Sequence, residues 1–134
     1  IGFYLDWRDP SWNVDPRMPP YQRGAYDYHD DHRLARSPEL PAAAYLAERC
    51  DSLLGQLPDA STWYVSHYLI ARCIDDGFNM AAWLHDHDVK LDAWTLDTDK
   101  PAAVTNALRL RDAGADLFTT NTPTALAALL NGAR

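Results

Sequence analysis

The stretch from Tyr26 to His32 gathers side-chain types that often hold metal ions. It reads Tyr26-Asp27-Tyr28-His29-Asp30-Asp31-His32 and so offers two histidines and three aspartates. Imidazole nitrogens and carboxylate oxygens both bind divalent cations, so this composition permits a metal site. The same residues also favour turns, and no regular element is expected here to fix ligands. We interpret the stretch as a solvated loop, with a lid or a substrate-contacting loop as the alternative.

Three other side chains, His67, Trp94 and Asn121, are each predicted to lie at or near the carboxyl end of a strand. Ligands of parallel α/β sheets bind at this end, so all three are candidates for substrate binding. Each also has a structural alternative. His67 could be a satisfied structural histidine, Trp94 ordinary core, and Asn121 a cap for the helix that begins at Pro123.

The strand predicted over 89–96 has two different faces. Side chains alternate along a strand, and one face is small and apolar, as expected under helices: Val89, Leu91, Ala93 and Thr95. Lys90, Asp92 and Trp94 lie on the other face, with Trp94 nearest the carboxyl end. An indole there supplies a flat apolar wall and an N–H donor. Lys90 and Asp92 are predicted to form a buried structural ion pair.

The remaining reactive residues give no catalytic pattern. His85 and His87 are two positions apart near a predicted helix end, so they point to different sides and cannot chelate together. Favourable interaction with the helix dipole is sufficient to account for them. Cys50 and Cys73 form no CxxC pair and are expected on buried helix faces. No nucleophile-elbow or catalytic-triad spacing occurs, so covalent hydrolysis has no support.

Composition limits the classes of partner. The 134 residues are 47% hydrophobic, enough for one domain with a core, and carry a formal net charge of −7. We expect no nucleic-acid partner, because polyanions are repelled and no basic patch is visible. We also expect no membrane span and a soluble protein, because the apolar stretches are far shorter than the roughly 20 residues that a spanning helix needs. No signal pattern is visible, so the compartment is left open.

Strand and helix patterns alternate along the chain. The predicted elements are a strand over 1–5, a long loop over 6–37, a helix from Ser37 to Gly55, a strand over 63–67, a helix over 70–87, a strand over 89–96, a helix from Pro101 to Gly114, a strand over 116–120 and a helix from Pro123. This order predicts an α/β fold with a parallel sheet covered by helices.

About four such β/α units make up half of a TIM (β/α)8 barrel, which takes about 250 residues. A half-barrel leaves two strand edges unpaired and an inner face uncovered. We therefore expect the missing amino-terminal half, or a second copy, to close it. The apolar start at Ile1-Gly2-Phe3-Tyr4-Leu5 also suggests that an upstream segment has been removed.

Two linked motifs resemble a known enzyme family. Trp94-Thr95-Leu96-Asp97 ends a predicted strand, and Gly114-Ala115-Asp116 opens the next strand, which runs into Thr119-Thr120-Asn121-Thr122-Pro123. Together they resemble the last two β/α units of glycerophosphodiester phosphodiesterases. The resemblance is strong over about residues 60–130 and weak before that. It implies that residues 1–134 are the carboxyl-terminal half of such a barrel and that Trp94 contacts substrate.

The resemblance also implies what is missing. In this family a His-Arg pair on the first strand, a Glu-x-Asp, a further histidine and a Glu-x-Lys perform the reaction, and the carboxylates hold a divalent cation such as Ca²⁺ or Mg²⁺. Glu39 and Glu48 are the only glutamates here, so Glu-x-Asp and Glu-x-Lys are absent. The resemblance thus carries over no catalytic residue and no metal ligand. We expect the chain alone to be inactive.

Two function classes therefore follow. The first is a fragment of a metal-dependent phosphodiesterase that cleaves glycerophosphodiesters to glycerol 3-phosphate and an alcohol, with a sphingomyelinase D-like activity as a variant of the same chemistry. The second is a non-catalytic binding or assembly module built by pairing two half-barrels. The substrate headgroup and the cation stay open.

Overall fold

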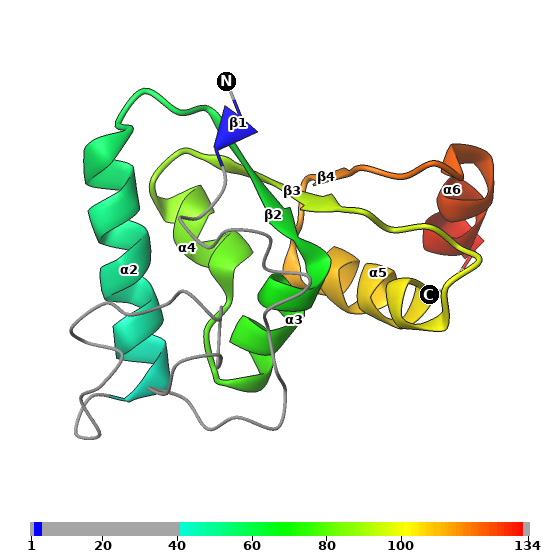
Figure 1. Ribbon diagram of the computed structural model, residues 1–134, viewed down its shortest axis with the longest axis horizontal. Helices are drawn as coiled ribbons and strands as arrows, with labels where there is room; N and C mark the ends of the chain where they lie inside the picture. The colour runs from blue at the N-terminus through cyan, green and yellow to red at the C-terminus, as the bar shows by residue number, and fades with distance from the viewer. Residues whose placement is uncertain (1, 4–40, 133–134) are drawn as a thin grey trace.

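The computed structural model describes residues 2–3 and 41–132. The predicted long loop over 6–37, with its Asp/His stretch, lies outside the described residues. The elements in chain order are β1 (Gly2–Phe3), α2 (Ala42–Gln56), β2 (Thr62–Ser66), α3 (His67–Asp75), α4 (Met80–Asp86), β3 (Lys90–Trp94), α5 (Pro101–Ala113), β4 (Leu117–Phe118) and α6 (Pro123–Gly132). Helices α2 and α6 lie at opposite ends of the molecule (Figure 1).

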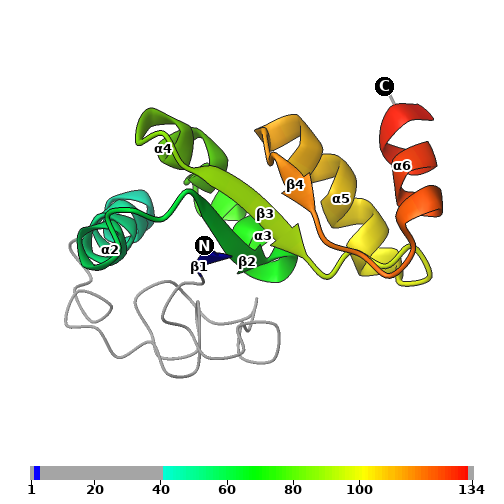
Figure 2. The same ribbon diagram turned by 90° about the horizontal axis from the view of Figure 1, so that it is seen from above.

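The four strands form one parallel sheet in the order β1-β2-β3-β4 (Figure 2). The spatial order therefore equals the order in the sequence. Crossovers between parallel strands are right-handed almost without exception, so a sequential order places the connecting helices on the same face of the sheet. The prediction of an α/β fold with a parallel sheet is confirmed.

The two faces of the sheet differ in burial as the alternation predicts. Trp63 pairs with Leu91, and Val65 pairs with Ala93. All four side chains are buried against the helices and form the centre of the core. On the opposite face Tyr64 is 39% exposed and Lys90 is also exposed. Burying apolar area on one face supplies most of the free energy that holds the helices to the sheet.

One predicted helix is in fact two. The segment 70–87 is divided at Gly77, whose φ of 87° lies in the left-handed region where glycine is favoured. Asn79 is the N-cap of the second helix, α4, and its Oδ1 accepts a hydrogen bond from the N–H of Ala82 at 3.1 Å. Asn79 Nδ2 also donates to the carbonyl of Ala113 at 3.0 Å and so ties the start of α4 to the end of α5.

The other boundaries shift by a few residues. His67 begins α3 instead of ending β2, because Ser66 caps the helix by accepting the Tyr68 N–H at 3.3 Å. Helix α2 begins at Ala42, with Pro41 in the N-cap position, later than the predicted start at Ser37. The last predicted strand shortens to Leu117–Phe118. The predicted start of α5 at Pro101 and its stop at Gly114 are confirmed.

Gly114 and Gly55 provide a matched pair for testing the backbone conformation at two glycines, one with a positive φ and one inside a helix. Gly114 has a φ of 103°, which costs a side-chain-bearing residue about 1–2 kcal/mol. Gly55 lies in the last turn of α2, and a Cβ there would meet nothing within 4 Å. We expect Gly114→Ala to lower the free energy of unfolding by about 1–2 kcal/mol and Gly55→Ala to raise it by about 0.5–1 kcal/mol. Urea unfolding measures both, and equal effects would contradict the assigned conformations.

Candidate functional site

A small cavity of about 180 Å³ lies at the carboxyl edge of the sheet, between the ends of β2 and β3. Ser66 and Trp94 are register partners at these two strand ends, and both line it. The described residues that line it are Ser66, His67, Tyr68, Trp94, Thr95 and Lys100. The structure therefore brings together two of the three predicted binding residues, His67 and Trp94.

His67 is 3% exposed and held by a neighbouring helix. Nδ2 of Asn106, on α5, lies 2.9 Å from His67 Nδ1. Burial, and secondly the charge of Lys100, lowers the pKa of His67 to about 4. The imidazole is thus neutral at pH 7. An amide NH₂ can only donate, so Nδ1 is the acceptor and the imidazole proton resides on Nε2.

Lys100 brings the positive charge of the cavity. It precedes α5, its side chain is 62% exposed, and its Nζ lies 3.9 Å from Asp97 Oδ2. An ion pair this long and exposed contributes little to stability. The ammonium group is therefore able to interact with an anion at the mouth of the cavity.

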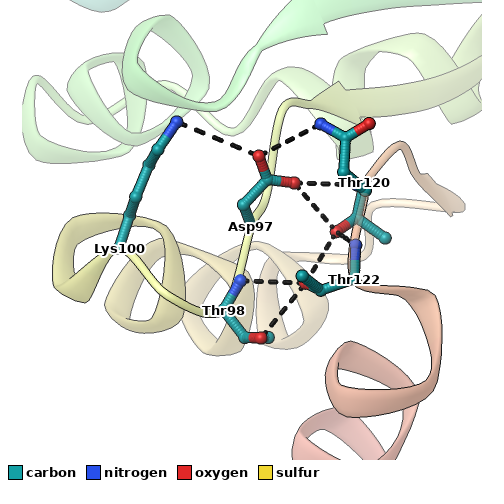
Figure 3. Close-up of polar contacts among 6 residues, drawn as sticks. Asp97, Thr98, Lys100, Thr120 and Thr122 are labelled. Atoms are coloured by element: carbon teal, nitrogen blue, oxygen red, sulfur yellow. Dashed lines mark hydrogen bonds and ion pairs between the residues drawn. The ribbon is translucent and has the colours of Figure 1, made fainter.

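Asn121 is not among the residues that line this cavity. Its backbone N–H and Nδ2 donate to the two carboxylate oxygens of Asp97, at 2.8 and 3.2 Å, and Thr120 Oγ1 donates to Asp97 at 3.2 Å (Figure 3). The backbone N–H of Asn121 is the main cause of a lowered pKa of Asp97. The alternative role as a helix cap is not seen either, because Asn121 Oδ1 accepts no hydrogen bond from the described residues.

Thr98 and Thr122 extend the same connection. Thr122 Oγ1 accepts from the backbone N–H of Thr98 at 3.0 Å and from its hydroxyl at 3.1 Å (Figure 3). The loops after β3 and β4 are therefore joined by side-chain hydrogen bonds, which we call the Asp97 latch: Asp97, Thr98, Thr120, Asn121 and Thr122. The polar residues in the second half of the family-like signature thus hydrogen-bond to the loop after β3, and the role of Asn121 in substrate binding stays a prediction.

Asp116, the aspartate of the Gly-x-Asp turn, has a similar role at the opposite edge of the sheet. Its Oδ2 accepts from the N–H of Leu91 at 2.8 Å and lies 2.8 Å from His85 Nε2. A larger cavity of about 540 Å³ opens at this amino-terminal edge. Ligands of parallel barrels bind at the other edge, so we do not take it as the active-site candidate.

His87 stacks on Trp83 with ring centroids 3.9 Å apart.

Asp92 does not form the predicted ion pair with Lys90. In the part of the chain that the structure describes, its carboxylate instead accepts from Thr119 Oγ1, at 2.9 and 3.0 Å. Thr119 comes from the segment after β4, so a neighbouring strand satisfies Asp92, whereas Lys90 extends into solvent. Burial raises the pKa of Asp92, and the Thr119 hydrogen bond opposes the shift.

Metal ligands and membrane helices are not found within residues 2–3 and 41–132. No group of three or more His, Cys, Asp or Glu side chains in these ranges could hold a metal ion. Nor is any helix there long and apolar enough to cross a membrane. The Asp/His stretch at 26–32 lies outside these ranges. So does His32-Arg33, a His-Arg dipeptide of the kind that the family motif contains. Cys50 and Cys73 are buried free thiols.

Comparison with protein-family models, curated proteins and solved structures gave no match for this chain.

Sequence reasoning missed Lys100 and Asn106. Lys100 follows β3 on the loop that leads into α5, and the rule that sites lie on such loops could have suggested it. Asn106 is 39 positions from His67 and reaches it only because α3 and α5 pack together. No sequence pattern marks such a contact.

The Asp97 latch predicts an acid-sensitive stability. Because the pKa of Asp97 is lowered in the folded protein, the carboxylate stabilises the fold above its unfolded pKa, and this contribution is lost as the pH falls through the folded value. We expect Asp97→Asn to lower the melting temperature at pH 7 and to have less effect near pH 3. The exposed neighbour Asp99→Asn is the control. A similar loss in both variants would argue against the latch.

The raised pKa of Asp92 predicts the opposite pH dependence of stability. Its raised pKa means that the folded protein holds a proton there to higher pH than the unfolded chain, so ionised Asp92 costs stability as the pH rises. Asp92→Asn should therefore raise the melting temperature at pH 7, with a smaller gain at acid pH, and exposed Asp59→Asn should not. A destabilised Asp92→Asn at pH 7 would contradict the assigned cost of burial.

Proposed function

We propose that this chain is the carboxyl-terminal half of a (β/α)8-barrel phosphodiesterase similar to glycerophosphodiester phosphodiesterases. The sequential strand order supports a barrel segment, because doubly wound sheets reverse their strand order whereas barrels do not. The polar or exposed side chains of Tyr64, Asp92 and Trp94 lie on the face opposite the core, which would be the inner face of a closed barrel.

The observation that carries the proposal is the cavity shared by His67 and Trp94. These side chains come from successive β/α units and converge at the carboxyl edge, where barrel enzymes bind substrate. The indole offers an apolar wall for a glycerol or alcohol group. The His67 Nε2–H and the Lys100 ammonium offer donors to an anionic phosphodiester.

The reaction itself requires groups beyond these. The described residues provide no ligand set for the divalent cation that the resemblance implies, and we derive no step through a metal. The proposal assigns the cation and the acid–base residues to the other half of the barrel. Within this chain, His67, Trp94 and Lys100 bind and orient the substrate.

A second candidate function, assembly of half-barrels, has its own observation. Tyr64 and Leu117 are 39% and 43% exposed, and both pair in register with Asp92 on the face away from the core. Exposed apolar side chains beside the short edge strand β4 favour contact with another β/α unit. Either an amino-terminal half-barrel or a second copy of this chain would cover this surface.

The enzyme proposal is tested by joining this chain to an amino-terminal half-barrel of the family. We expect the joined protein to release glycerol 3-phosphate from glycerophosphocholine when Mg²⁺ or Ca²⁺ is present. Trp94→Ala should reduce kcat/KM by about 10- to 100-fold, because the alcohol group loses its positioning wall. Trp83→Phe, on α4 and outside the cavity lining, is the control and should retain activity.

Two results would overturn this proposal. One is no hydrolysis of glycerophosphocholine by a folded joined protein, and the other is equal activity of Trp94→Ala and the unsubstituted protein. Release of choline from sphingomyelin instead would favour the sphingomyelinase D-like alternative. Sedimentation of the chain alone tests assembly: a stable monomer with a cooperative thermal transition would exclude pairing of two copies.

A further inference from the structure

His67 has one ring nitrogen committed and the other open. Nδ1 is 2.9 Å from Asn106 Nδ2, while no group among the described residues hydrogen-bonds Nε2. The side chain is 3% exposed and still lines the cavity. Nε2 is not among the buried polar atoms that lack a partner, so it is accessible from the cavity, where a ligand atom can replace water as its hydrogen-bond partner.

The Asn106 amide decides what kind of partner Nε2 can take. Its NH₂ group has no lone pair to offer, so the hydrogen bond requires an unprotonated Nδ1. A neutral imidazole then carries its proton on Nε2. Protonation of Nδ1 would place two donors face to face at 2.9 Å, within range of the Lys100 charge. With the amide NH₂ facing Nδ1, Nε2 is an uncharged donor.

The rest of the cavity selects the chemical class of the acceptor. Among the described residues that line it none is acidic, and Lys100 is the one cationic side chain. The titratable neighbours of His67 are Lys100 and Tyr68, and Asp97 lies beyond Lys100. At about 180 Å³ the cavity is smaller than the roughly 300–1,000 Å³ of drug-sized sites. It suits a small anionic group with acceptor oxygens.

We infer that His67 Nε2–H and Lys100 bind a non-bridging phosphoryl oxygen of the substrate, and that Asn106 is a positioning residue that holds His67 in the donor tautomer. This inference rests on the proposed function, because it names the substrate group held by the same cavity. It differs from a general-acid or general-base role, which needs a group that titrates near the working pH. Binding through a neutral donor is independent of pH over the range where His67 stays neutral.

The direct test is the tautomer of His67. Nitrogen NMR of histidine-labelled protein, recorded on the chain and on the joined barrel, distinguishes a protonated Nε2 from a protonated Nδ1. We expect the Nε2–H form at pH 7. Asn106→Asp should reverse it, because a carboxylate accepts from Nδ1–H and also favours the imidazolium form. Asn131→Asp, on the exposed surface of α6, is the matched control and should leave the tautomer unchanged.

Binding of dimethyl phosphate provides the functional readout, because this diester keeps one negative charge between pH 5 and 8. We expect its affinity to be constant over this range for the unsubstituted protein and about 10-fold lower for His67→Phe, which loses one hydrogen bond to a charged group. In Asn106→Asp the affinity should be low at pH 8 and recover on acidification, as Nε2 regains a proton. A purely structural Asn106 would not produce this pH dependence.

The outcomes separate this inference from the proposed enzyme. An Nδ1–H tautomer in the unsubstituted protein, or equal dimethyl phosphate affinity in the unsubstituted, His67→Phe and Asn106→Asp proteins, would overturn it even if the joined barrel hydrolyses glycerophosphocholine. His67-dependent binding in a joined barrel without hydrolysis would instead support the phosphoryl site and reject the enzyme assignment.

Discussion

Five consecutive residue pairs join β2 to β3 in parallel register, from Thr62 with Lys90 to Ser66 with Trp94. This pairing decides which side chains enter the core and which reach the candidate site. A shift of β3 by one residue would move Leu91 out of the core and expose it. It would also separate His67 from Trp94, because Trp94 pairs with Ser66 and His67 directly follows Ser66. Fold and site therefore depend on the same backbone hydrogen bonds.

Two aspartates join β3 to β4 from opposite edges of the sheet. Asp116 binds the N–H of Leu91 at the start of β3, and Asp97 binds the N–H of Asn121 after β4. Each carboxylate satisfies a backbone donor of a neighbouring unit that would otherwise lose a partner. The pairing of β3 with β4 spans only two residue pairs, so side-chain hydrogen bonds compensate for a short ladder. The family-like signature is accordingly explained mostly by strand joining, with Trp94 as the exception.

The sequence alone predicted the two boundaries of α5, because local backbone chemistry determines them. Pro101 and Gly114 bound α5 as predicted, since one fixes φ at a helix start and the other adopts a positive φ at its end. The break at Gly77 was missed because apolar spacing continues through it, although Asn79 is a recognisable cap. The barrel itself stays a prediction.

The site was less predictable, because its side chains are oriented by partners distant in sequence. Position at a strand end was enough to select His67 and Trp94. It also selected Asn121, whose amide is engaged by Asp97 across 24 positions. Asn106 gave no signal, since only the packing of α3 on α5 brings it to His67. Strand ends locate such a site, whereas helix packing determines which atoms donate within it.

The described lining of the candidate cavity comes from two successive β/α units. β2 and α3 supply Ser66, His67 and Tyr68, and β3 with its following loop supplies Trp94, Thr95 and Lys100. α5 then fixes the imidazole from behind through Asn106. In a sheet of sequential order each unit packs mainly on its neighbours, so a site built from adjacent units needs no distant strand to hold its shape. In the proposed function such a wall would be preorganised, because the contact with Asn106 orients the His67 ring before a substrate binds.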